Sequence, residues 1–226
     1  MKSEVVLYRK YRPHNFEEVL GQDHVVAVLQ NAVKLNRISH AYLFSGPRGT
    51  GKTSVARIFA RSVGCEDMDL LEIDAASSRG IDEIRALRDA VRLVPFQSPY
   101  KVYVVDEVHM LTKEAFNALL KTLEEPPKHA IFILATTELN KVPDTIISRC
   151  QHFVFRKAPE SIIRSSILEI AKKEGFKLDD EAAGLIALFA DGSFRDAQSM
   201  LDQIFSLVGE KIITGEKVRE FLAAPA

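Results

Sequence analysis

The segment "LFSGPRGTGKTSVARIFA", residues 43–60, has the residue types and spacing of a phosphate-binding loop. It matches G-x-x-x-x-G-K-[ST] between an apolar strand pattern and a helical pattern, a context that a ligand-free glycine turn would not need. Lysine at the end of such a loop reaches the β and γ phosphates, and the following hydroxyl binds Mg²⁺. We expect an ATP–Mg²⁺ site made by Gly46, Pro47, Arg48, Gly49, Thr50, Gly51, Lys52, Thr53 and Ser54.

Two adjacent acids end the apolar pattern "KVYVVDEVHM", residues 101–110. Asp106 would lie at the carboxyl end of a strand, where open α/β sheets bind ligands, and would hold Mg²⁺ together with Thr53. Glu107 is a candidate to polarise an attacking water, or alternatively a cap of the next element. The pair favours hydrolysis over transfer to a small phosphate acceptor. His109 completes the tetrad "DEVH", which also occurs in helicases, but no second helicase-like domain is visible.

Two weaker signals follow along the chain. Thr136 and Thr137 in "ILATTEL" would reach the same edge of the sheet, where a hydroxyl can contact a γ phosphate or a water. Threonine is also an ordinary strand residue, so the type alone decides nothing. In "DGSFRDAQSML", Ser193 and Asp196 form a capping-box pattern that places Arg195 in the first helical turn. The helix dipole disfavours a cation there, and a bound triphosphate would offset this.

The pattern of elements predicts an α/β domain over residues 1–157 and a small helical lid domain over residues 158–226. The first has five β-rich apolar runs separated by helical patterns, which favours a parallel sheet with helices on both faces. The runs are Ala41–Phe44, Leu70–Ile73, Val102–Val105, Ile131–Leu134 and Phe153–Phe155. Helices are expected over residues 80–91 and 112–125, and in the lid at Glu160–Glu174, Asp179–Ala190 and Ser193–Leu207.

Composition sets further limits. The chain has 226 residues and a formal net charge of -1, so any contact with nucleic acid must come from local patches. Two cysteines, Cys65 and Cys150, exclude a four-cysteine metal site and a disulfide framework. No apolar run is long enough for a signal peptide or a membrane span. A cytoplasmic protein without a membrane partner is expected.

Several motifs in a fixed order resemble one known family. With "LYRKYRPHNFEEVLGQ", the loop, "VVDEVHML", "KTLEEPP", "LATT", "SRC" and "GSFRDA", the chain is similar to the tau/gamma subunits of bacterial DNA polymerase III. These are AAA+ ATPases of the sliding-clamp loader, and the likeness covers nearly the whole chain. The resemblance implies strand order 5-1-4-3-2 and a three-helix lid. It also implies ATP-driven opening of the sliding clamp and its loading on primed DNA, together with other loader subunits.

The resemblance also implies roles for single residues. Thr137 would sense the γ phosphate, and Arg195 would be the sensor arginine of the lid. Arg149 of "SRC" would act as an arginine finger in the ATP site of a neighbouring subunit, because no acid adjacent to it in the sequence accounts for its charge. Template-strand phosphates would meet Arg79 and Lys121. The adenine pocket would be lined by Arg12, Pro13, Val19 and Leu20.

The chain departs from the family in one motif. Family members carry four cysteines that bind zinc before the "IDAAS" strand, and "SVGCEDMDLLEID" keeps only Cys65. Zinc is therefore not expected. A C-terminal collar domain, which assembles the family's pentamer, is also not expected within residues 1–226, so this chain alone can remain a monomer.

Three other functions compete with clamp loading. The first is another AAA+ DNA-remodelling ATPase, such as a Holliday-junction helicase or a helicase loader. The second is a structural loader subunit that binds no ATP, against which Lys52, Thr53, Asp106 and Glu107 argue. The third is a small-molecule kinase, for which a substrate lid with paired arginines is not evident.

Overall fold

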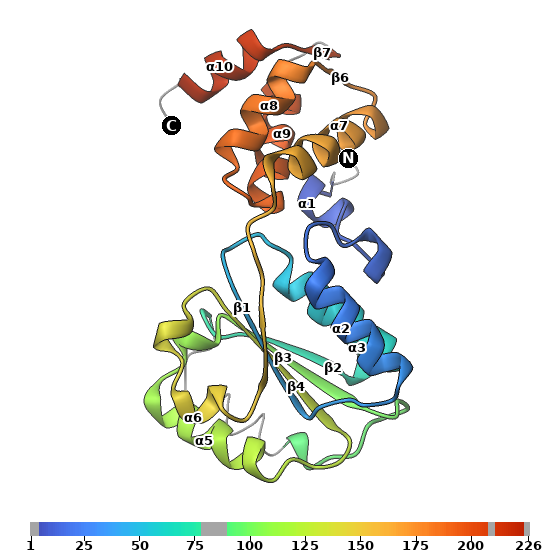
Figure 1. Cartoon of the computed structure of the whole chain (residues 1–226), viewed down its shortest axis with the longest axis vertical. Helices are drawn as coiled ribbons and strands as arrows, with labels where there is room; N and C mark the ends of the chain where they lie inside the picture. The colour runs from blue at the N-terminus through green and yellow to red at the C-terminus, as the bar shows by residue number, and fades with distance from the viewer. Residues whose placement is uncertain (1–4, 78–89, 208–210, 224–226) are drawn as a thin grey trace.

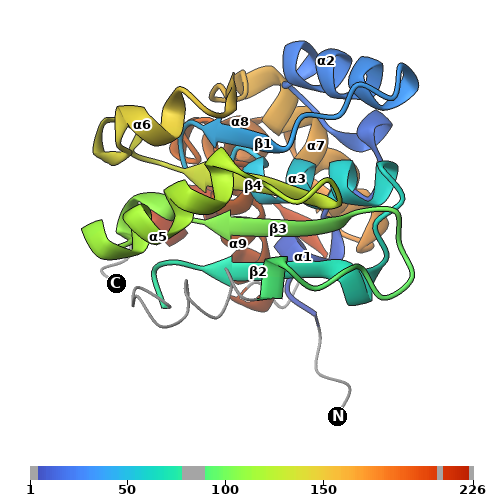
Figure 2. The ribbon, with the colours of Figure 1, turned by 90° about the horizontal axis from the view of Figure 1, so that it is seen from below.

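The computed structural model describes residues 5–77, 90–207 and 211–223, which form two lobes (Figure 1). The larger lobe contains a five-stranded sheet in the order β2-β3-β4-β1-β5, with every neighbouring pair parallel. This confirms the predicted order 5-1-4-3-2. Figure 2 shows the strands side by side from β2 to β1. Their bounds are β1 (Ala41–Ser45), β2 (Leu70–Asp74), β3 (Lys101–Asp106), β4 (Ala130–Thr136) and β5 (Gln151–Val154).

Helices cover both faces of the sheet, as its continuous apolar strands predicted. Tyr42 and Phe44 of β1 pack with α2 and α3 on one face, whereas Leu43 packs with α5 and α6 on the other. All of these side chains are fully buried. The bounds are α2 (Asp23–Lys34), α3 (Lys52–Ser62), η2 (Asp67–Asp69), η3 (Val108–Met110), α5 (Lys113–Glu124), η4 (Leu139–Lys141) and α6 (Asp144–Ile147).

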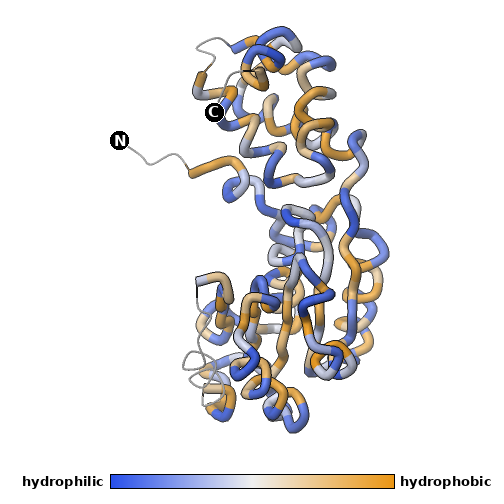
Figure 3. The backbone as a smooth tube through the Cα atoms, turned by 90° about the vertical axis from the view of Figure 1, so that its left-hand side faces the viewer, coloured by the Kyte–Doolittle hydropathy of each residue, from blue (hydrophilic) through white to orange (hydrophobic). Residues whose placement is uncertain are grey.

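The smaller lobe is the predicted helical lid. Its core is built from isoleucine, leucine and alanine side chains, and hydrophobic and hydrophilic stretches alternate along its helices (Figure 3). This lobe also contains two parallel strands of two residues each, which the sequence pattern did not indicate. The bounds are α7 (Glu160–Lys173), β6 (Lys177–Leu178), α8 (Asp180–Phe189), α9 (Phe194–Leu207), β7 (Ile212–Ile213) and α10 (Gly215–Ala223).

The N-terminal segment joins the two lobes. In α1 (Leu7–Lys10), Leu7 belongs to the lid core, and the hydroxyl of the following Tyr11 donates to Glu174, directly after α7, at 2.5 Å. Burial and this neighbouring carboxylate raise the pKa of Tyr11 to about 12. Farther along, η1 (Phe16–Glu18) and Val19 pack into the core of the sheet lobe. The segment therefore crosses from one lobe to the other before the first strand begins (Figure 1).

A buried amide holds the linker between β5 and α7. Gln22 is fully buried, donates through Nε2 to the carbonyl of Arg156 at 2.7 Å, and accepts at Oε1 from the Arg156 N–H at 3.1 Å. The same Nε2 lies 3.5 Å from the carbonyl of Thr50 in the phosphate-binding loop. The Gln22 side chain thus satisfies both the N–H and the carbonyl of Arg156, next to the phosphate-binding loop.

Arg79 and most of the helix expected over residues 80–91 lie outside the described residues. Within the described ranges, every helix is too short or too polar to cross a membrane.

We predict that Gln22→Met, which keeps the volume and removes the amide, lowers the free energy of unfolding by about 2–4 kcal/mol, because two buried backbone groups lose their partner. Urea unfolding measures the change. The matched control is Gln30→Met, since Gln30 is only partly buried and makes one long contact, 3.4 Å to Glu17. Equal losses in the two variants would contradict the assigned role of Gln22.

Candidate functional site

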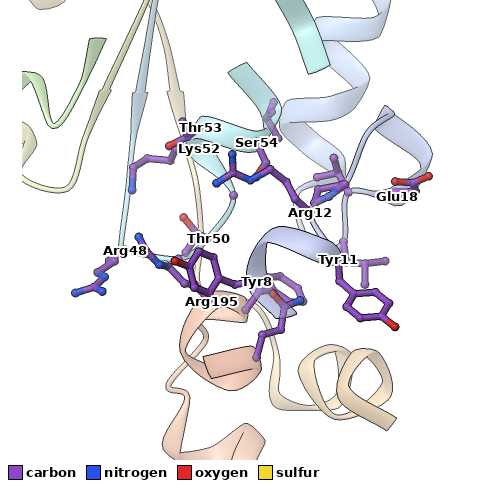
Figure 4. A pocket seen from close by; sticks show the side chains of 18 of the residues that line it. Tyr8, Tyr11, Arg12, Glu18, Arg48, Thr50, Lys52, Thr53, Ser54 and Arg195 are labelled. Carbon is purple, nitrogen blue, oxygen red and sulfur yellow. The ribbon is translucent and has the colours of Figure 1, made fainter. Parts of the chain in front are cut away.

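A pocket of about 190 Å³ lies where the phosphate-binding loop, the N-terminal segment and the lid meet (Figure 4). Fourteen of the predicted site residues line it: Arg12, Pro13, Val19, Leu20, Arg48, Gly49, Thr50, Gly51, Lys52, Thr53, Ser54, Asp106, Glu107 and Arg195. Gly46 and Pro47 belong to the same loop but do not line the pocket. The structure therefore gathers residues from positions 12 to 195 into one cavity.

Two glycines of the loop are required by their packing as well as by ligand access. Gly46 has φ 141°, and a Cβ there would collide with the carbonyl oxygen of Phe155 after β5. Gly49 has φ 72°, and its Cβ would collide with the Ser193 hydroxyl of the lid. The carbonyl of Gly49 accepts from the Phe194 N–H, the first residue of α9, at 3.1 Å. The loop and the lid thus touch backbone to backbone.

Lys52 is a buried cation at the start of α3. Its side chain donates through Nζ to the carbonyls of Gly46 and Pro47, both at 2.8 Å. Burial lowers the pKa of its ammonium group, and the carboxylates of Glu107 and Asp106 act in the opposite direction. A phosphate would offer this ammonium a better acceptor than loop carbonyls do, so the site fits an anionic ligand.

Thr53 and Asp106 meet at the carboxyl end of β3. The Thr53 hydroxyl donates to Asp106 Oδ2 at 2.7 Å, so the two predicted Mg²⁺ ligands are neighbours. Hydroxyl and carboxylate oxygens suit Mg²⁺, which completes its shell with phosphate oxygens and waters. No cluster of three or more histidine, cysteine or acidic side chains that could hold a metal ion occurs within the described ranges.

Glu107 adopts a left-handed backbone with φ 48°, uncommon for a residue with a side chain and often found at functional sites. Its Oε2 accepts from the Thr137 hydroxyl at 2.9 Å and from the Thr137 N–H at 3.2 Å. Glu107 is the N-cap residue of η3, as the capping alternative expected, but its side chain makes no capping hydrogen bond and contacts Thr137 instead. Thr137 does not line the pocket but is connected to it through Glu107.

Arg195 and Arg12 add positive charge to the pocket. The Arg195 guanidinium lies over the ring of Tyr8, with its carbon 4.9 Å from the ring centre (Figure 4). Burial lowers the pKa of Arg12, and the charges of Arg57 and Arg195 lower it further against the effect of Glu72. A negatively charged ligand would stabilise these cations.

At the start of α9, one of the two reciprocal hydrogen bonds of the predicted capping box is formed and the other is replaced. The Ser193 hydroxyl accepts from the Asp196 N–H at 3.2 Å, as predicted. The Ser193 N–H, however, donates to the carbonyl of Ala190 at 2.9 Å, because the turn before the helix already occupies it. Asp196 is therefore not the reciprocal acceptor, although Arg195 still lies in the first turn.

Sequence reasoning missed several residues that line the pocket. They are Tyr8, Tyr11, Glu18, Val55, Ser166, Phe194 and Gln198. Tyr8 and Tyr11 come from "LYRKYRP", which was singled out without a role for its aromatic residues. Ser166 and Gln198 carry no signal in the sequence, since only the packing of the lid helices brings them to the pocket.

Arg149 and Lys121 lie outside the pocket. The acid that pairs with Arg149 lies far from it in the sequence: its Nη2 donates to Glu124 at the end of α5 at 2.7 Å, and its Nη1 donates to the carbonyl of Thr145 at 2.7 Å. The reason is spatial, because α6 packs on α5 although 25 residues separate the two side chains. Lys121 is an exposed residue of the same α5.

Two family models match the chain. One is described as "DNA polymerase III, delta subunit" and matches residues 21–76 and 67–159. The other is described as "DNA polymerase III clamp loader subunit, ATPase lid domain" and matches residues 162–209. Together they cover the sheet lobe and most of the lid.

Named relatives agree with these models. The chain is 51% identical over 225 residues to DNA polymerase III subunit tau of Bacillus subtilis, covering 90% of this chain and 40% of that protein. It is 46% identical over 233 residues to subunit gamma/tau of Mycobacterium tuberculosis, covering 93% and 40%. For subunit tau of Escherichia coli the identity is 45% over 219 residues, covering 88% and 34%. The chain thus spans well under half the length of these relatives.

Solved structures share the fold. RuvB of Thermotoga maritima, described as a Holliday junction branch migration motor, superimposes with a TM-score of 0.76 at 21% identity, covering 94% of this chain and 72% of that one. At this identity the likeness concerns the AAA+ fold alone.

We predict that Gly49→Ala opens the contact between loop and lid, since its Cβ would collide with Ser193. Hydrogen exchange of the Phe194 N–H should become faster, and the free energy of unfolding should fall by about 2–5 kcal/mol from backbone strain plus overpacking. The control is Gly175→Ala, where φ is 81° but no atom lies within 4 Å of the added Cβ. This control should cost about 1–2 kcal/mol of strain and leave Phe194 protected. Unchanged exchange in Gly49→Ala would refute the contact.

Proposed function

Because this chain belongs to the clamp-loader subunit family of bacterial DNA polymerase III, we propose that it binds and hydrolyses ATP between its two lobes. As a motor subunit of the loader, it would use ATP to open the sliding clamp and place it on primed DNA. One observation carries the proposal: Lys52, the Thr53–Asp106 pair, Glu107 and Arg195 line a single pocket.

Binding of ATP would use both ends of the pocket. Pro13, Val19 and Leu20 offer an apolar wall for the adenine, with Arg12 at its border. Lys52 and the N-terminus of α3 would bind the phosphates, and Arg195 would reach them from the lid. The buried or crowded cations Lys52 and Arg12 gain an opposite charge in this arrangement, so binding and closure of the lid support each other.

Hydrolysis requires a carboxylate that can polarise a water. The described contacts of the Glu107 carboxylate all use Oε2, so Oε1 remains for a water in the pocket. Thr137 orients Glu107 through its hydroxyl and its N–H. Mg²⁺, when bound near Thr53 and Asp106, neutralises charge that develops on the phosphates. A structural subunit without ATP chemistry would not need these groups together.

The partners are the other loader subunits, the sliding clamp and primed DNA. Arg149 would act in the ATP site of a neighbouring subunit, because its own pocket does not include it. Its Nη1 donates to the Thr145 carbonyl and, at 3.5 Å, to the Ser148 hydroxyl, and its Nη2 donates to Glu124. A guanidinium has five N–H groups, so further ones remain for phosphate oxygens. Lys121 and Arg79 would contact template-strand phosphates.

We predict that Lys52→Ala removes ATP binding, whereas Glu107→Gln keeps ATP binding and slows turnover by about 10²–10⁴, as expected for loss of a general base. Calorimetry with Mg-ATP and steady-state hydrolysis by the full-length protein in its assembled loader separate the two effects. Lys113→Ala is the control, because Lys113 is an exposed residue at the start of α5. Full turnover by Glu107→Gln would assign the base to another residue.

We predict that Arg149→Ala leaves ATP binding by its own subunit intact and slows hydrolysis in the neighbouring subunit by up to about 10³–10⁵. Assemblies that mix Arg149→Ala subunits with Lys52→Ala subunits in controlled order measure this. Arg164→Ala is the matched control, because it breaks an exposed ion pair with Asp180 of similar length, 2.8 Å, in the lid. Loss of activity confined to the site within the mutated chain would sink the finger assignment.

A further inference from the structure

His109 lies directly behind Glu107 and has no role in the site described so far. It belongs to η3, which follows Glu107, and only 5% of its side chain is exposed. A buried histidine next to the proposed base is the part of the motif "DEVH" that ATP binding leaves unexplained. Its contacts indicate what it does.

Three polar groups surround the imidazole. Its Nδ1 lies 3.0 Å from the Thr136 hydroxyl and 3.4 Å from Glu107 Oε2, and its Nε2 lies 3.2 Å from Glu138 Oε1. The ring therefore connects the base to the end of β4 and to the residue that follows Thr137. The chain reaches Glu107 from β3 and Glu138 from β4, and His109 bridges the two.

The hydrogen bonds are consistent with a neutral ring. The Thr136 hydroxyl oxygen accepts from the Glu138 N–H at 3.0 Å, so its own hydrogen is available for Nδ1. The hydrogen on Nε2 then points to the Glu138 carboxylate. In this tautomer Nδ1 accepts from the Thr136 hydroxyl and Nε2 donates to Glu138, so Nδ1 has no hydrogen to donate to Glu107, whose Oε2 accepts from Thr137.

We propose that His109 is a positioning residue for Glu107: as a neutral imidazole it holds the base against Thr137 with one carboxylate oxygen left for water. The proposal rests on the proposed function of Glu107. A proton on Nδ1 would replace the lone pair by a donor that faces Glu107 Oε2. The carboxylate would then be held in an ion pair and would be a weaker base.

The charged groups around the ring are known. Glu107 and Glu138 face it directly, and Glu138 is bound to Lys141 at 2.8 Å. The hydrogen bond from Lys141 lowers the pKa of Glu138, and the charge of Lys141 adds to this, so Glu138 stays an acceptor for Nε2. Lys52 and Asp106 lie on the far side of Glu107, in the pocket. Histidine ordinarily changes its charge between about pH 5 and 8, which makes the state of the ring testable.

The test is steady-state ATP hydrolysis by the full-length protein in its assembled loader, from pH 5.5 to 8.5, with calorimetry of Mg-ATP binding. His109→Ala should lower kcat by about 10–100-fold, as a misplaced base does, and change the Kd of Mg-ATP less than about twofold. His109→Asn, which keeps a polar atom near Nδ1 but does not titrate, should recover most of kcat at pH 8. The kcat of the native protein should decline toward acid pH, and the kcat of His109→Asn should not.

His129→Ala is the matched control. His129 is also partly buried and its Nε2 contacts the carbonyl of Val91 at 3.0 Å, but it does not line the pocket. Native kcat in His109→Ala, or an unchanged acid decline in His109→Asn, would overturn the proposal. A fall in kcat of His129→Ala as large as that of His109→Ala would do the same. If Glu107→Gln retains full turnover, the proposed function fails instead, whatever the histidine variants do.

Discussion

The backbone contact between Gly49 and Phe194 is the constraint on which the rest of the structure depends. It brings the phosphate-binding loop against the start of α9, with the Ser193 hydroxyl packed where any side chain at position 49 would lie. This approach places Arg195 at the pocket and closes the cavity from the lid side. The position of the N-terminal segment depends on the same contact. Its helix α1 packs on α9, and the residues after α1 can reach the sheet lobe because the two lobes lie close together.

The second consequence of this arrangement is a concentration of positive charge at the pocket. Burial lowers the pKa of Lys52 and of Arg12, and Arg195 adds another cation at the same cavity, where it rests on the ring of Tyr8. Within the chain these cations are stabilised by the carbonyls of the phosphate-binding loop, the ring of Tyr8 and the carboxylates of Asp106 and Glu107. A triphosphate would supply the missing negative charge, and lid and loop would then hold each other more firmly through it.

The segment from the end of β4 to the start of β5 connects residues that the proposed function assigns to two different ATP sites. Thr136 is hydrogen-bonded to His109, and Thr137 to Glu107, which lines the pocket of this chain. Twelve residues after Thr137, Arg149 lies on the outside, bonded to Glu124 of α5. A rigid strand end and a short helix thus separate the base of one site from the arginine proposed for the next.

The sequence by itself determined the elements and the local chemistry. Short-range patterns sufficed for the phosphate-binding loop, the acids after β3, the apolar strands and the lid helices, because each depends on neighbours in the chain. Strand order was available only through resemblance. Tertiary structure alone decided that Glu124 pairs with Arg149, that Tyr8 lies under Arg195, and that Gln22 holds the linker at Arg156. These contacts join residues 25 to 187 positions apart, and no periodicity reports which side chains packing brings together.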